Sequence, residues 1–173
     1  MPSLIYLGAE HGSSRQESLS LQWDDIDFEY DEIGMIKLFR IKNKRKRLEY
    51  LMPRTKKALL EWKDHLEFIR HRKRIQPIET RFVFCRLNGQ PIKRFDSAWR
   101  HICKIAKITD FHYYDLRHTF CYNLLLSGAN IKDVKEMIGH SDISMTDRYS
   151  HLTLNHHKAI QDKLAKHYDN TTN

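Results

Sequence analysis

The sequence lacks the features that mark membrane, fibrous and secreted proteins. No stretch approaches the ~18 consecutive apolar residues that a membrane-spanning helix needs, so we expect no membrane span. Six glycines and four prolines in 173 residues are too few for a collagen-like chain or a flexible linker. Residues 1–9 are largely apolar but carry no basic flank, so they do not predict a secretory signal.

Cysteine is scarce too. The three cysteines, Cys85, Cys103 and Cys121, are widely spaced and form no C-x-x-C motif. We interpret them as reduced core residues of a cytoplasmic protein rather than as disulfides or metal ligands. The sequence also contains no glycine-rich phosphate loop, no G-x-S-x-G and no H-E-x-x-H motif. Its neighbouring histidines are not at zinc-finger spacing, so we expect no metal site.

Positive charge is in excess, because 30 lysines and arginines against 22 acidic residues give a formal net charge of +8. This excess favours a polyanionic partner, most often nucleic acid, although a merely soluble basic protein also fits. Seven of the eleven residues from Lys37 to Arg47 are basic. We predict a hairpin tip at Lys42 to Arg47, where so many like charges would repel one another unless they met an anion. A solvated loop is the alternative.

Hydrophobic periodicity predicts an α+β fold that is mainly α-helical. Residues 1–21 predict two helical pieces broken near Gly12, and Asp25 to Met52 alternate as a small antiparallel sheet with a turn at residues 32–34. Further elements are expected as follows: a helix from Pro53 to about His71, a short buried strand at 82–84, helices at 95–106 and 114–126, a helix at 131–138 that Asn130 caps, a helix that Ser144 caps, and a last helix from Leu154 to His167.

Three short motifs follow one another in the second half of the chain. Leu116-Arg117-His118-Thr119-Phe120 begins a predicted helix, Ile138-Gly139-His140-Ser141 follows, and Tyr149-Ser150-His151 comes nine residues after His140. In this order and spacing they resemble the catalytic domain of the tyrosine recombinase (phage integrase) family. The resemblance extends upstream, because the segment from Gly12 to Asp27 is similar to the family's first arginine box. The basic hairpin after it is similar to the loop that carries the family's catalytic lysine.

The resemblance implies a helical catalytic core, with a small sheet near its N-terminal side, that breaks and rejoins DNA without a metal or another cofactor. Tyr149 would be the nucleophile and form a 3′-phosphotyrosyl link. Arg117, His140 and Arg15 would stabilise the transition state, since a guanidinium can clamp two phosphate oxygens at once. Lys42 would protonate the leaving 5′ oxygen, with Lys44 as the alternative. Lys44, Arg45, Lys46 and Arg47 would bind the DNA backbone.

Two positions depart from the family pattern. The family's first arginine usually stands three residues before the glutamate, and that position holds Ser14 here, while Arg15 stands two before Glu17. The family usually has histidine or lysine three residues before Arg117, and this chain has Tyr114. A tyrosine hydroxyl can hydrogen-bond a phosphate but carries no charge. His112 is a possible substitute, and His151 is a possible auxiliary residue.

The resemblance covers nearly the whole chain, so we expect residues 1–173 to be one catalytic domain. Family members commonly carry N-terminal DNA-binding domains, and these are absent from this sequence, which is expected to be a fragment or a truncated gene product. The expected function is site-specific recombination in phage or mobile-element integration or excision. The partner would be double-stranded DNA, with self-association into a tetramer on DNA, in the cytoplasm at the nucleoid.

A second interpretation is a DNA-binding relative that has lost catalysis. Asn130 to His151 could form a helix-turn-helix, with the basic hairpin gripping the backbone, and the departures at Ser14 and Tyr114 would fit a degenerate site. Covalent trapping on DNA distinguishes the two interpretations, since only a nucleophile forms an adduct. An RNA-binding module has little support, because no strand carries the aromatic pattern typical of one.

Overall fold

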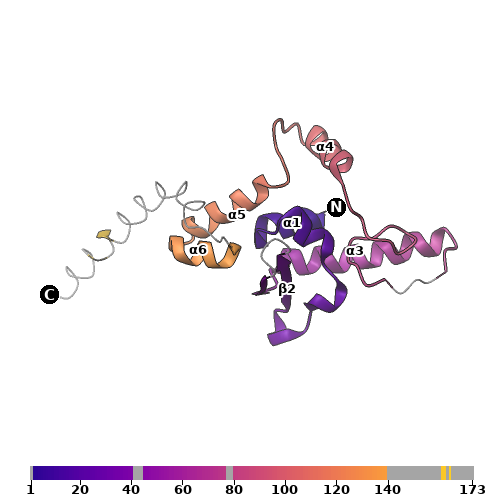
Figure 1. The fold of residues 1–173 in the computed structure, drawn as a ribbon, viewed down its shortest axis with the longest axis horizontal. Coiled ribbons are helices and arrows are strands. Elements are labelled where there is room, and N and C mark those ends of the chain that lie inside the picture. Colours follow the sequence, from indigo (N-terminus) through magenta and orange to yellow (C-terminus); the bar gives the residue numbers. More distant parts are fainter. Residues whose placement is uncertain (1, 41–44, 77–79, 140–160, 163, 165–173) are drawn as a thin grey trace. The chain divides into compact units, whose positions relative to one another are not determined.

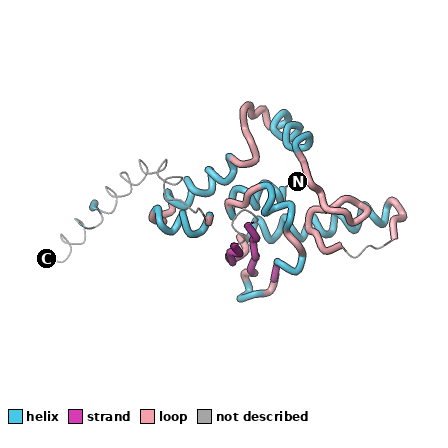
Figure 2. Tube along the Cα trace, in the orientation of Figure 1, coloured by secondary structure: helices cyan, strands magenta, loops and turns pink. Residues whose placement is uncertain are grey.

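The computed structural model describes residues 2–40, 45–76, 80–139, 161–162 and 164. The chain forms two compact units, Met1–Phe120 and Cys121–Asn173, and each is described by itself. Helices and loops make up most of the described chain, and the strands form one small sheet (Figures 1 and 2). The prediction of a mainly helical α+β fold is therefore confirmed.

The chain begins with two helices joined by a tight turn. Helix α1 spans Pro2–His11 and α2 spans Arg15–Ser20, which confirms the predicted break. Gly12 lies between them with φ +56°, in the left-handed region that glycine enters without strain. A Cβ at Gly12 would lie 2.5 Å from the Phe120 ring, so this turn also packs tightly against the segment that holds Phe120.

The sheet follows as three antiparallel strands in the order β1-β2-β3. Strand β1 is Ile26–Asp27, β2 is Met35–Arg40 and β3 is Arg45–Tyr50. Register is set by pairs such as Met35 with Tyr50 and Arg40 with Arg45. The predicted hairpin is confirmed, but β3 already begins at Arg45, so Arg45, Lys46 and Arg47 belong to a strand rather than to the tip. Residues 41–44 lie outside the described residues.

Short 3-10 turns lead into the sheet, at Trp23–Asp25 and at Tyr30–Glu32, the second just before the predicted turn. Helix α3 spans Pro53–Arg72 with proline at its N-terminus, where the missing N–H costs nothing. Helix α1 packs against α3. One apolar core joins these elements, with fully buried side chains that include Leu7, Ile36, Leu38 and Leu59.

The predicted strand at residues 82–84 is wrong. Val83 and Phe84 are buried as expected, but the strand pairing consists of isolated bridges, which join Phe82 to Gln22 and Cys85 to Pro91. The Trp23 amide donates to the Arg81 carbonyl and the Val83 amide donates to the Leu21 carbonyl, but the pairing extends no further into a ladder. Burial was thus predicted correctly and the extended pairing was not.

Helix α4 spans Asp96–Ile105, α5 spans Asp115–Leu126 and α6 spans Ile131–Ile138. The Asn130 side chain accepts hydrogen bonds from the Lys132 and Asp133 amides, and Gly139 ends α6 at φ +64°, as predicted. None of the three cysteines, all within the described residues, forms a disulfide; Cys85 and Cys121 are buried and Cys103 is half-buried. The predicted helices near Ser144 and from Leu154 to His167 fall, apart from a few positions, outside the described residues.

Candidate active site

Glu17 is the centre of the candidate site. Its side chain is 1% exposed and forms a reciprocal capping box with Ser14: the Ser14 amide donates to Glu17 Oε2 at 2.7 Å, and the Glu17 amide donates to Ser14 Oγ at 3.3 Å. The capping box fixes the start of α2 and the direction of the carboxylate. Ser14, one of the departures from the family pattern, therefore has a structural role as a helix cap.

Arg117 lies against this carboxylate. Its guanidinium is 3.6 Å from Glu17 Oε2 and donates to the Gly12 carbonyl. Arg117 is buried at 2% exposure, so it is not a surface arginine with a solvent-exposed partner. A buried guanidinium needs a counter-charge, and Glu17 supplies it. The fold thus brings the L-R-H-T-F motif of α5 onto the arginine-box segment of α2, which the sequence places far apart.

A second arginine shares the same carboxylate. The Arg47 Nε lies 3.6 Å from Glu17 Oε1, its Nη1 is ion-paired with Glu49, and its Nη2 donates to the His11 carbonyl at 2.7 Å. Glu49 also pairs with His11 Nδ1 at 2.8 Å. Arg47 is only 12% exposed, so it points into the domain, whereas the sequence placed it among backbone-binding residues at a hairpin tip.

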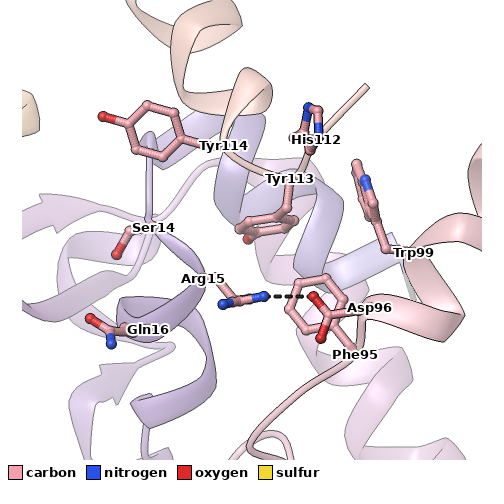
Figure 3. A pocket seen from close by; sticks show the side chains of 9 residues that line it. All are labelled: Ser14, Arg15, Gln16, Phe95, Asp96, Trp99, His112, Tyr113 and Tyr114. Atoms are coloured by element: carbon pink, nitrogen blue, oxygen red, sulfur yellow. Dashed lines mark hydrogen bonds and ion pairs between the residues drawn. The ribbon is translucent and has the colours of Figure 1, made fainter. Parts of the chain in front are cut away.

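An open hollow of about 370 Å³ lies beside the start of α2. Three segments form its wall: the start of α2, the residues around the start of α4, and residues 112–114. The lining residues are Ser14, Arg15, Gln16, Phe95, Asp96, Trp99, His112, Tyr113 and Tyr114 (Figure 3). The hollow gathers four residues that bear on the departures from the family pattern: two stand at the departing positions and two are candidate substitutes. Those residues are Ser14, Arg15, His112 and Tyr114.

Arg15 enters the hollow from the first turn of α2. Its Nη1 donates to Asp96 Oδ1 at 2.7 Å, and Arg94 Nε donates to the other oxygen of Asp96 at 3.0 Å. Hydrogen bonding from Arg94, together with the nearby charge of Arg15, keeps the pKa of Asp96 below its ordinary value. Asp96 is therefore ionised at neutral pH. Arg15 is not part of the buried group formed by Glu17, Arg117 and Arg47, which we call the Glu17 cluster.

The other two candidate site residues that line the hollow, His112 and Tyr114, are exposed. His112 Nδ1 is 3.7 Å from Asp115, and its side chain is 78% exposed. Tyr114 is 42% exposed, and its ring meets His118 edge-on at a centroid distance of 5.2 Å. Both can reach an anion that enters the hollow, the imidazole as a cation when protonated and the phenol as a neutral hydrogen-bond donor.

Tyr113 forms the floor of the hollow and ties it to the core. Its hydroxyl donates to the Leu4 carbonyl at 2.8 Å and is 2.9 Å from Ser18 Oγ. Burial raises the pKa of Tyr113 to about 12, because an apolar environment disfavours the phenolate. Tyr113 is therefore a structural phenol rather than a nucleophile.

Several sequence candidates lie outside the described residues: Lys42, Lys44, His140, Tyr149 and His151. Of the strand residues, Lys46 is exposed and Arg47 is largely buried. Sequence reasoning missed Asp96 and the inward role of Arg47. The alternation of β3 was the available signal for Arg47, since Arg47 and Glu49 fall on the face opposite Lys46, Leu48 and Tyr50.

Two kinds of feature are absent from the described residues. No cluster of three or more histidine, cysteine, aspartate or glutamate side chains there has the arrangement of a metal site. Within the same residues, no helix combines the length and apolar character that crossing a membrane requires.

Comparisons with known proteins find similarity to tyrosine recombinases. Tyrosine recombinase XerD of Listeria monocytogenes is 32% identical over 141 residues, covering 79% of this chain and 45% of that protein. Tyrosine recombinase XerC of Thermodesulfovibrio yellowstonii is 29% identical over 166 residues, covering 93% of this chain and 53% of that protein. The chain therefore spans about half the length of the curated relatives it matches.

Solved structures share the fold. The crystal structure of XerA recombinase aligns with a TM-score of 0.67 at 22% identity, over 95% of this chain and 57% of that one. The catalytic domain of bacteriophage HP1 integrase aligns with a TM-score of 0.60 at 20% identity, over 87% and 73%. The family model described as the phage integrase family matches residues 3–156. With most of its length matched by that model, this chain belongs to the phage integrase family.

Proposed function

We propose that the chain is the catalytic part of a site-specific DNA recombinase that cleaves and rejoins DNA through Tyr149. The observation that carries the proposal is the meeting of Arg117 with Glu17, which joins two motifs of the family in one buried cluster. A rigid guanidinium is suited to hold the non-bridging oxygens of a phosphate. Glu17 and the Gly12 carbonyl keep Arg117 in one orientation, so little ordering remains to be done when DNA binds.

In the proposed reaction the Tyr149 hydroxyl oxygen attacks the scissile phosphorus. The bond from phosphorus to the 5′ oxygen breaks, and Lys42 supplies a proton to that oxygen, which leaves as a 5′-hydroxyl. Arg117, His140 and a second arginine, for which Arg15 is the candidate, stabilise the charge on the phosphoryl oxygens. Tyr114, His112 and His151 are auxiliary candidates. The phosphodiester energy stays in the phosphotyrosyl link, so religation needs no nucleotide cofactor.

The proposed partner is double-stranded DNA, with tetrameric self-association on it, at the nucleoid in the cytoplasm. Two structural neighbours support a DNA partner: XerH recombinase was solved bound to its difH substrate, and the Tn1549 transposon integrase was solved with a circular intermediate DNA. The second neighbour supports a role in integration or excision of a mobile element. The net charge of +8 is consistent with a polyanionic partner.

Covalent trapping tests the proposal, and a randomised substrate pool makes a defined target site unnecessary. The chain is incubated with a pool of nicked duplexes whose central sequence is randomised, and the mixture is denatured and run on a gel. A nick near the scissile phosphate lets the cleaved fragment diffuse away, so the adduct accumulates. We expect the wild type to form an adduct resistant to denaturation, and Tyr149→Phe to form none while binding the pool equally well.

One observation favours the non-enzymatic alternative enough to keep it. Ser14 holds the family's first-arginine position and is used as a helix cap, and Arg15 is bound to Asp96 rather than to the Glu17 cluster. A DNA-binding relative that has lost catalysis would retain the basic surface and form no adduct with any member of the pool. Binding without trapping would therefore replace the enzyme proposal with this alternative.

A further inference from the structure

Arg15 is half exposed, yet its guanidinium is fixed at one end. Side-chain exposure is 48% for Arg15 and 42% for Asp96. Asp96 is itself held, because its second oxygen accepts from Arg94. The carboxylate is thus bridged by two arginines, and the three side chains together carry a net charge of +1. Such an arrangement attracts an anion while keeping one arginine in a defined place.

The bond to Asp96 uses only one corner of the Arg15 guanidinium. Nη1 makes the contact, and the structure gives no other hydrogen-bond partner to Arg15 among the described residues. A guanidinium has five N–H donors in one plane, so the edge formed by Nε and Nη2 remains available for two parallel hydrogen bonds. Figure 3 shows Arg15 between Gln16 and Asp96, with one nitrogen directed at the Asp96 carboxylate.

We propose that Asp96 is a positioning residue for Arg15, which it orders in the hollow so that the Nε–Nη2 edge can bind a phosphate of DNA. The inference rests on the proposed function and deepens it. It gives Arg15 a route to the phosphate from a position one residue away from the family's arginine. It also assigns a role to Asp96, which comes from a different element, α4.

The physical basis is conformational entropy. A solvent-exposed arginine samples many rotamers and loses that freedom when it binds an anion. The ion pair with Asp96 restricts that freedom before DNA arrives. The carboxylate has an opposite effect on affinity, because its negative charge repels the DNA backbone. Asp96 therefore lowers the affinity for DNA through its charge and raises the reaction rate by positioning Arg15. Measuring both quantities distinguishes positioning from simple electrostatics.

The test compares Asp96→Asn, Arg15→Gln and the double variant with the wild type. Asp64→Asn is the control, since it removes one exposed carboxylate from α3 outside the hollow. Affinity is measured with a 20-base-pair duplex of arbitrary sequence, and adduct rate with the nicked duplexes recovered from the pool. We expect Asp96→Asn to bind the duplex at least as tightly as wild type and to form adduct about tenfold more slowly. In the Arg15→Gln background the same change should have no further effect.

An NMR measurement on Arg15 tests the inference independently of catalysis. The ¹⁵Nε–H resonance of Arg15 should shift when the same duplex is added to wild type, and should broaden and respond less in Asp96→Asn. A wild-type protein that forms no adduct would overturn the proposed function, and the resonance would still report on positioning. Three outcomes would overturn the inference. The Arg15 resonance could stay unchanged when the duplex is added, or Asp96→Asn could form adduct as fast as wild type or faster. The third is that Asp96→Asn slows adduct formation as much in the Arg15→Gln background as in wild type.

Discussion

One buried residue, Tyr113, makes the free energy of unfolding depend on pH. Its pKa is raised from 10.0 to about 12 by burial, so the folded state favours the neutral phenol. The stability that this preference contributes is fully present below pH 10, and it is lost as the pH rises from about 10 through 12. Two pKa units correspond to roughly 3 kcal/mol of unfolding free energy.

Tyr113→Phe is expected to remove this alkaline loss. The variant also loses the hydrogen bonds to the Leu4 carbonyl and Ser18, so it should be less stable than wild type at pH 8 by about 1 kcal/mol. The difference between the two proteins should then shrink above pH 10. Urea unfolding at pH 8, 9, 10 and 11 measures it. A gap that stays constant over that range would show that Tyr113 does not titrate with a raised pKa.

The sequence predicted only part of the candidate site. The sequence placed Glu17 in the arginine-box segment but did not pair it with Arg117, because only the fold brings the two together. Asp96 could not, because nothing in the local sequence links it to Arg15, and only the packing of α4 beside α2 brings the two within 2.7 Å. Ser14 stands where the family pattern has an arginine, while its local chemistry is that of an N-cap.

The β2–β3 hairpin shows the same limit at the scale of an element. Basic composition predicted a charged tip from Lys42 to Arg47, yet Arg45 to Arg47 lie in β3. Period-two alternation then sends Arg47 inward to Glu17 and Glu49 and leaves Lys46 outside. Capping chemistry was a better guide, since Asn130 and Gly139 bound α6 as predicted. At residues 82–84 the apolar pattern predicted burial correctly, but it did not show that the pairing with Gln22 stops at an isolated bridge.

Arg47 is expected to matter for stability far more than its neighbour in the same strand. Arg47→Gln leaves the buried carboxylates of Glu17 and Glu49 with one fewer cation, and breaking a buried ion pair costs roughly 3–5 kcal/mol. Lys46→Gln is the matched control, because the Lys46 side chain is exposed and such changes stay within about 0.5 kcal/mol. Chemical unfolding of both variants measures the contrast, and equal losses would show that the Glu17 cluster does not hold the hairpin.

The whole molecule combines a net charge of +8 with a buried arginine cluster and a separate open hollow. In the proposed function, the net charge attracts DNA over a distance, the buried cluster fixes Arg117, and the hollow offers Arg15, His112 and Tyr114 to an anion. The matched relatives are about twice as long. DNA contacts made by this chain alone are therefore expected to be fewer than in those proteins, with a weaker dependence of affinity on salt.

The most direct test of the central proposal is the identity of the residue that carries the DNA. The adduct trapped from the nicked pool is digested with nuclease and protease, and the peptide that retains a nucleotide is sequenced by mass spectrometry. We predict a 3′-phosphate joined to the Tyr149 hydroxyl, with a free 5′-hydroxyl on the released strand. A nucleotide on any other residue, or a link through a 5′-phosphate, would contradict the proposed reaction.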